Sequence, residues 1–212
     1  MLTLLGSTVR ATLFTSMGTP LTIPDGNVAG IDNTINVSGL ASTVSSLTLS
    51  LNISGGRNGD LYAYLTHDNA TAILLNRVGR GEVAGGYTDS GFQVTLQDGD
   101  DATDIHVNTS GGGPLIGTFE ADGRNVSPFV STTSSPRNSS PFSAFTGGTA
   151  NGGWTLFIAD VNGNSSESTL DSWSLDITAV PEPVEYALMV FGGIVALVQG
   201  RRWMKNRKTI QA

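Results

Sequence analysis

Residues 151–160 read Asn-Gly-Gly-Trp-Thr-Leu-Phe-Ile-Ala-Asp, and residues 168–177 read Ser-Thr-Leu-Asp-Ser-Trp-Ser-Leu-Asp-Ile. In both stretches large hydrophobic side chains stand at every second position, first from Trp154 to Ile158 and then from Trp173 to Ile177. A β-strand turns alternate side chains to opposite faces, so this period predicts two strands that each bury one face. We expect both tryptophans to lie in a core between sheets, because large aromatic side chains bury the most apolar surface.

The same alternation continues outward from this pair. It is clear over residues 47–53 and 61–65, where Tyr62 and Tyr64 take the face opposite the leucines, and weaker over residues 35–37, 70–78, 92–96 and 115–119. Clusters of Gly, Asn, Asp and Ser separate these runs, and residues 125–143 show no period and predict a long surface loop. About eight strands without a soluble helix predict an all-β fold, an antiparallel jelly-roll-like β-sandwich over residues 23–179.

The composition and charge of the chain exclude cysteine-dependent sites and argue against nucleic-acid binding. The chain has 212 residues, no Cys and only 14% charged residues, which excludes a disulfide framework, a Cys-ligated metal, a thiol nucleophile and a long salt-bridged helix. The first 180 residues contain six Arg, no Lys and 16 Asp and Glu. Because affinity for nucleic acid depends on Lys and Arg that neutralise phosphates, we expect no nucleic acid partner.

Catalytic motifs are missing as well. The only histidines are His67 and His106, and no Gly-x-Ser-x-Gly elbow is present, so a triad of His106, Asp104 and a serine has no support from the sequence pattern. We therefore expect a protein that is not an enzyme.

Two acidic segments are candidate calcium sites. From Asp160 to Asp171, oxygen-bearing side chains stand at positions 1, 3, 5, 7, 9 and 12, the spacing of a twelve-residue calcium loop, which names Asp160, Asn162, Asn164 and Asp171 as ligands. The alternative is a hairpin loop in which Asn and Gly only supply turn geometry. A second, weaker candidate consists of Asp98, Asp100, Asp101 and Asp104, whose alternative is an acidic turn neutralised by solvent.

The C-terminus carries three features in a fixed order. Pro181, Glu182 and Pro183 precede an uncharged hydrophobic run over residues 186–200, which predicts one C-terminal hydrophobic helix that spans a membrane. A basic tail over residues 201–212 follows and predicts a cytoplasmic C-terminus, with the acidic body on the other side of the inner membrane. The basic stop consists of Arg201, Arg202, Lys205, Arg207 and Lys208.

This C-terminal segment, residues 180–212, resembles the PEP-CTERM sorting signal of Gram-negative bacteria. The resemblance implies recognition by an exosortase, a membrane protease that cuts near the Pro-Glu-Pro motif. The protein would be anchored transiently in the membrane and then pass to the cell surface or extracellular matrix. Residues 1–22 are interpreted as a lead-in, the incomplete remainder of an export region, because Arg10 interrupts any apolar leader.

The body resembles the P domain, or Homo B domain, of proprotein convertases. The anchors are Gly59-Asp60-Leu61, Gly153-Trp154-Thr155-Leu156 and Leu170-Asp171-Ser172-Trp173, in that order, together with Ile23-Pro24-Asp25-Gly26. By their place in this pattern, Asp25 and Asp60 are further candidate calcium ligands. The resemblance implies a module that stabilises or binds a partner.

Three functions stay open on the sequence alone, and a residual hydrolase activity of the chain itself is the fourth and last. The first is a non-enzymatic exported interaction module. The second is a carbohydrate-binding or adhesive module for exopolysaccharide, favoured if Tyr62, Tyr64 or Tyr87 form an exposed platform on one sheet face. The third is an accessory domain for a separate subtilisin-like serine protease.

Overall fold

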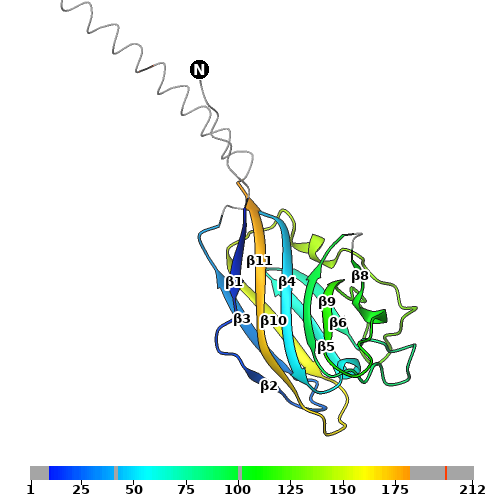
Figure 1. Cartoon of the computed structure of the whole chain (residues 1–212). Helices are drawn as coiled ribbons and strands as arrows, with labels where there is room; N and C mark the ends of the chain where they lie inside the picture. Colours follow the sequence, from blue (N-terminus) through cyan, green and yellow to red (C-terminus); the bar gives the residue numbers. More distant parts are fainter. Residues whose placement is uncertain (1–9, 41–42, 100–101, 182–198, 200–212) are drawn as a thin grey trace, which may run out of the picture.

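The computed structural model describes residues 10–40, 43–99 and 102–181, together with Gln199. Strands dominate this part of the chain, as Figure 1 shows. The strands are β1 (Ala11–Thr15), β2 (Leu21–Ile23), β3 (Ile31–Val37), β4 (Thr43–Gly55), β5 (Leu61–His67), β6 (Ala70–Asn76), β7 (Phe92–Gln97), β8 (Thr103–Asp104), β9 (Leu115–Glu120), β10 (Gly152–Asp160) and β11 (Ser168–Val180). The described residues also form three short 3₁₀ helices, η1 (Asn58–Asp60), η2 (Ile105–Val107) and η3 (Pro141–Phe145).

The strands form two sheets in a sandwich-like arrangement. The larger sheet has the order β1-β11-β4-β7-β9-β8, with β2 pairing the first residues of β11, and the smaller sheet has the order β3-β10-β5-β6. The predicted all-β sandwich is confirmed, and all eight predicted strands are present. One feature departs from an antiparallel arrangement, since β9 runs parallel to both β7 and β8.

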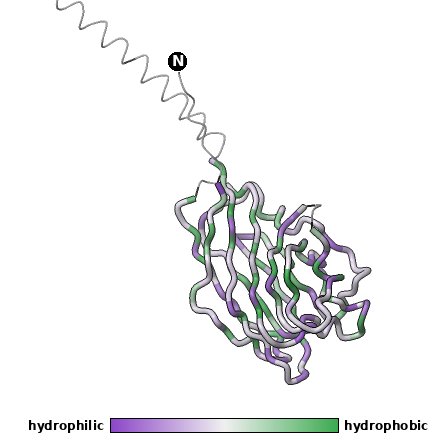
Figure 2. The backbone as a smooth tube through the Cα atoms, in the orientation of Figure 1, coloured by the Kyte–Doolittle hydropathy of each residue, from purple (hydrophilic) through white to green (hydrophobic). Residues whose placement is uncertain are grey.

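The core lies between the sheets and is built by the alternation in the sequence. In β4, Leu47, Leu49, Leu51 and Ile53 are all buried, while the residues between them face outward. Hydrophobic and hydrophilic positions accordingly alternate along the strands in Figure 2. Trp154 and Trp173 are 0% and 2% exposed, and their indole nitrogens donate to the Ala150 carbonyl and to Asn33 Oδ1, so the predicted core role of both tryptophans is confirmed.

The N-terminal boundary of the sandwich differs from the predicted one. Residues 11–15, placed in the lead-in by the sequence, form β1 and pair with β11 from Ala11 opposite Thr178 to Thr15 opposite Ser174. The alternation of apolar and polar residues is weak in this strand because β1 lies at the edge of the sheet, where Leu13 is 64% exposed. The sandwich therefore begins at Ala11 rather than at Ile23.

The two ends of the sandwich carry different parts of the chain. β11 starts at Ser168, beside β2, and runs for 13 residues to Val180, a length of about 40 Å. We call the end with residues 24–30, η1 and residues 161–167 the loop pole, and the end where β1 begins and β11 finishes the tail pole. In Figure 1 the loop pole lies at the bottom, near the β2 label, and the tail pole at the top.

Candidate functional site

The loop pole gathers three carboxylates from distant parts of the chain. Asp25 follows β2, Asp60 ends η1, and Asp160 is the last residue of β10. β10 pairs with β5 so that Asp160 stands opposite Leu61, which sets it beside Asp60. The loop of residues 161–167 then covers both, and the Val161 amide donates to the Asp60 carbonyl at 2.9 Å.

The Asp60 carboxylate contacts more side chains than the other two carboxylates of this pole. Its side chain is 1% exposed, and it accepts hydrogen bonds from Asn162 Nδ2 at 2.9 Å and from Asn164 Nδ2. Arg57 Nε and Arg77 Nη2 lie 3.8 and 3.7 Å from its oxygens, beyond hydrogen-bonding distance. Two side chains of the predicted calcium loop thus reach Asp60, about 100 residues earlier in the chain.

Asp160 differs from Asp60 because one of its oxygens has no partner. Oδ1 accepts a hydrogen bond from the Asn162 amide at 3.0 Å, whereas Oδ2 is buried and makes no hydrogen bond. The residue is 0% exposed. Burial raises the pKa of Asp160 to about 6, and the nearby charge of Asp60 adds to this rise against the backbone amides of Asn162 and Gly26. Asp160 Oδ2 is therefore a buried oxygen with neither a hydrogen bond nor an ion pair within the described residues.

Asp25 fixes the tip of the same loop. Its two carboxylate oxygens accept hydrogen bonds from the backbone amides of Asn164 at 3.1 Å and Ser165 at 2.9 Å, which hold the pKa of Asp25 below its ordinary value. The two loops meet at Gly26 and Gly163, where a Cβ on Gly26, which has φ +62°, would lie 2.7 Å from the Gly163 Cα. Only glycine fits this approach.

The donor set at the loop pole suits a hard cation in part. Carboxylate and amide oxygens are ligands that calcium accepts, and Asp160 Oδ2 lacks any other partner. However, among the described residues no group of three or more His, Cys, Asp or Glu side chains is placed to hold a metal ion. Both Asn side chains direct their NH₂ groups at Asp60, so a cation between them requires the amides to rotate and present their oxygens.

Asp171 does not join the other residues of the predicted loop. It lies three residues inside β11, and its carboxylate accepts a hydrogen bond from Ser54 Oγ on β4 at 3.1 Å. No hydrogen bond connects it with Asp160, Asn162 or Asn164 in the described structure. Because β11 has already begun at Ser168, position 12 of the pattern belongs to a sheet and not to the loop.

The second acidic segment is divided between two unrelated places. Asp98 accepts a hydrogen bond from the Phe142 amide at the start of η3, and burial raises its pKa. Asp104 instead pairs with Arg124, 2.8 Å away. Asp100 and Asp101 lie outside the described residues.

A buried ionic network beside Asp104 was missed by the sequence reasoning. Arg124, whose side chain is 2% exposed, bridges Asp104 and Asp122, and Asp122 Oδ2 lies 2.7 Å from His106 Nδ1. Arg137 adds a contact to Glu120 at 2.5 Å. No local motif marks these residues, since Asp122 follows His106 by 16 positions, and only the fold brings them together.

Neither histidine ring has a free nitrogen. His106 Nε2 lies 3.0 Å from the Arg80 carbonyl, opposite the Asp122 contact. His67 places Nδ1 and Nε2 each 2.9 Å from a backbone carbonyl, those of Gly153 and Thr149, and its ring stacks on Trp154 at 4.0 Å. Both rings thus hold loops in place.

The tyrosines do not share one platform. On the outer face of the smaller sheet, the Tyr64 ring stacks on Phe157 at 4.7 Å and meets Tyr62 edge-on at 5.9 Å, so the rings cover one another. All three side chains are half-buried. Tyr87 lies elsewhere, with its ring against Gly79.

The sorting signal falls largely outside the described residues. Pro181 is described and directly follows β11, whereas Glu182, Pro183 and the five residues of the basic stop are not. In the part of the chain that the structure covers, no helix is long and apolar enough to cross a membrane. The predicted span of residues 186–200 lies outside that part except for Gln199.

Comparison with known proteins assigns the chain to no family. No protein family model matches the chain, and no curated protein matches it. Among solved structures, it is similar to the crystal structure of serine protease of Aeromonas sobria, with a TM-score of 0.44 and 15% sequence identity over 81% of this chain and 27% of that one. The chain thus spans about a quarter of that protein's length.

Proposed function

We propose that this protein is a non-enzymatic interaction module of the P-domain type, displayed at the bacterial cell surface by a PEP-CTERM signal. The observation that carries this proposal is the course of β11. It runs from the loop pole at Ser168 to the tail pole at Val180, and Pro181 of the signal follows at once. A sandwich held through residues 181–212 thus presents the loop pole on the side away from its attachment.

The surroundings of the histidines support a role without catalysis. A general base needs a ring nitrogen within reach of a substrate proton. All four ring nitrogens of His67 and His106 instead lie within 3.0 Å of carbonyl or carboxylate oxygens of the fold.

We further propose that the loop pole binds calcium. Asp60, Asp160 and Asn162 would hold the ion, with Asn164 and Asp25 shaping the loop around it, and the ion would supply the positive charge that Asp160 Oδ2 lacks. With two strong carboxylates, the expected dissociation constant is about 10⁻⁴ to 10⁻³ M, the range of extracellular modules.

Surface display is tested by following the protein in cells that contain an exosortase. An antibody against the sandwich should label intact wild-type cells and detect a form released from the inner membrane. Replacing Pro181, Glu182 and Pro183 with Ala should retain the protein in the membrane fraction. The matched control replaces Thr209, Ile210 and Gln211 with Ala and should behave as wild type. Identical fractionation of all three proteins, or wild-type protein in the cytosol, would overturn the proposal.

A further inference from the structure

The outer face of the larger sheet carries a row of hydroxyl groups across five neighbouring strands. Thr15 stands opposite Ser174, Ser174 opposite Ser50, Ser50 opposite Thr95, and Thr95 beside Thr118. Residues directly opposite one another share a sheet face, and all five are exposed or half-exposed. With strands about 4.8 Å apart, the row spans about 19 Å.

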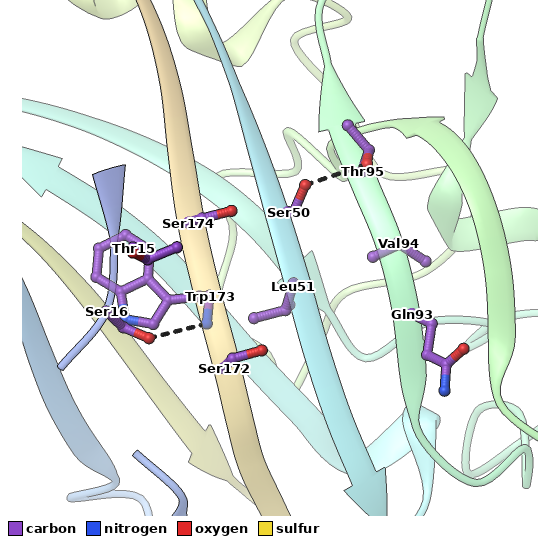
Figure 3. A pocket seen from close by; sticks show the side chains of 10 residues that line it. All are labelled: Thr15, Ser16, Ser50, Leu51, Gln93, Val94, Thr95, Ser172, Trp173 and Ser174. Carbon is purple, nitrogen blue, oxygen red and sulfur yellow. Dashed lines mark hydrogen bonds between the residues drawn. The ribbon is translucent and has the colours of Figure 1, made fainter. Parts of the chain in front are cut away.

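A second row on this face adds amide groups. Ser172 stands opposite Asn52, and Asn52 opposite Gln93. Beside both rows the surface is hollowed by about 270 Å³, and Figure 3 shows the Ser, Thr and Gln side chains that line this hollow. A second hollow of about 380 Å³ continues along β4 and β7, beside Ser46, Thr48 and Gln97. The two hollows form a polar strip that follows β4.

The side chains that line this strip carry almost no charge although the domain is acidic, and Asp176, opposite Thr48 on the same face, lies outside the lining. Of the side chains that line the two hollows, Asp98 alone is ionisable, and η3 engages its carboxylate through the Phe142 amide. Ser50 and Thr95 bond to each other at 3.2 Å, whereas the side chains of Ser174, Thr118 and Gln93 make no hydrogen bond within the described structure. Hydroxyl and amide groups that both donate and accept are thus directed at solvent in a regular array.

We propose that the strip along β4 and β7 binds an uncharged polysaccharide chain. A neutral sugar polymer presents closely spaced hydroxyl groups that also donate and accept, so it matches the array without requiring charge. A polyanion would meet no Lys or Arg among the lining residues. A protein partner usually requires an exposed apolar centre, whereas the apolar side chains that line the hollows are all buried, namely Leu47, Leu51, Val94, Phe142 and Trp173. This inference names the partner of the module proposed above and rests on its display at the surface, but it involves neither the tyrosines nor the loop pole.

The binding test uses the full chain in a polyoxyethylene detergent, which has no sugar headgroup. Its migration is measured in native gels that contain hydroxyethyl cellulose, laminarin or galactomannan, or alginate as an anionic comparison, each with millimolar calcium and with chelator. We expect at least one neutral polymer to retard the protein and alginate to leave it unaffected. No retardation by any neutral polymer, or equal retardation by alginate, would overturn the proposal whether or not surface display holds.

Two variants locate the binding. Thr95→Glu places a charge at the centre of the strip and should weaken retardation at least tenfold, and Ser50→Ala, which keeps the shape, should weaken it about two- to fivefold. Thr155→Glu is the matched control, since Thr155 lies in a comparable row of threonines, opposite Thr34 and Thr66, on the outer face of the smaller sheet. Equal losses of retardation in Thr95→Glu and Thr155→Glu, with circular dichroism confirming that both variants are folded, would contradict this location.

Light scattering tests the alternative that the strip is a contact between two copies of the chain. A dimer that only Thr95→Glu disrupts, together with no binding of any polymer, would assign the strip to that contact and overturn the proposal.

Discussion

The loop pole and the buried network around Arg124 are both rich in carboxylates, yet their charges are balanced differently. In the network, Asp104 and Asp122 share the Arg124 guanidinium, and His106 occupies the other oxygen of Asp122. At the loop pole, Asp60 accepts hydrogen bonds from two amides and has Arg57 and Arg77 only at 3.8 and 3.7 Å, and Asp160 keeps one buried oxygen without a hydrogen-bond partner. A cluster of acidic residues therefore indicates a cation site only where the fold leaves a buried carboxylate oxygen without a partner.

The largest expected loss of stability follows from removing Arg124 from the buried ionic network. Arg124→Met removes a buried cation from two carboxylates, and leaving buried charge uncompensated costs about 3–5 kcal/mol. Urea unfolding of the full chain in detergent measures this loss. The control is Arg57→Met at the loop pole, where the side chain is 33% exposed and 3.8 Å from Asp60, so the free energy of unfolding should change by less than about 1 kcal/mol. Equal losses would show that the two regions do not differ as described.

The next effect concerns pH at the loop pole. Because the pKa of Asp160 is raised to about 6 from an ordinary 3.8, folding favours its protonated form. This contribution is complete below about pH 4 and is lost as pH rises through 6, with an upper limit of about 3 kcal/mol. The Asp160→Asn side chain does not ionise. In the presence of chelator, the free energy of unfolding of this variant should therefore increase relative to that of wild type as the pH rises from 4 to 7. Parallel curves for the two proteins would contradict the raised pKa of Asp160.

The smallest effect is expected for a predicted ligand that the fold separates from the site. Asp171→Asn keeps an acceptor for Ser54 Oγ, so it should change the free energy of unfolding by less than about 0.5 kcal/mol and leave any calcium response intact. Calcium titration of this variant checks the exclusion of Asp171. Loss of the calcium response in this variant would show that Asp171 is a ligand after all.

Local patterns predicted the strands better than the sites. The alternation from Leu47 to Ile53 reflects burial of one sheet face, a property of the strand itself, and it was sufficient to predict β4. The bonds from Asn162 and Asn164 to Asp60 join segments about 100 residues apart, and no spacing rule contains them. Sequence spacing also placed Asp171 in the loop because it takes no account of where β11 begins.

The most direct measurement is the thermal and urea unfolding of the full chain in detergent, with 10 mM calcium and with excess chelator. For a dissociation constant of about 10⁻⁴ to 10⁻³ M, calcium should raise the free energy of unfolding by about 1.4–2.7 kcal/mol. The rise should disappear in Asp160→Asn and persist in Asp104→Asn, which alters only the network. No rise in wild type, or the same rise in Asp160→Asn, would contradict the claim that the unpartnered carboxylate at the loop pole is a calcium ligand.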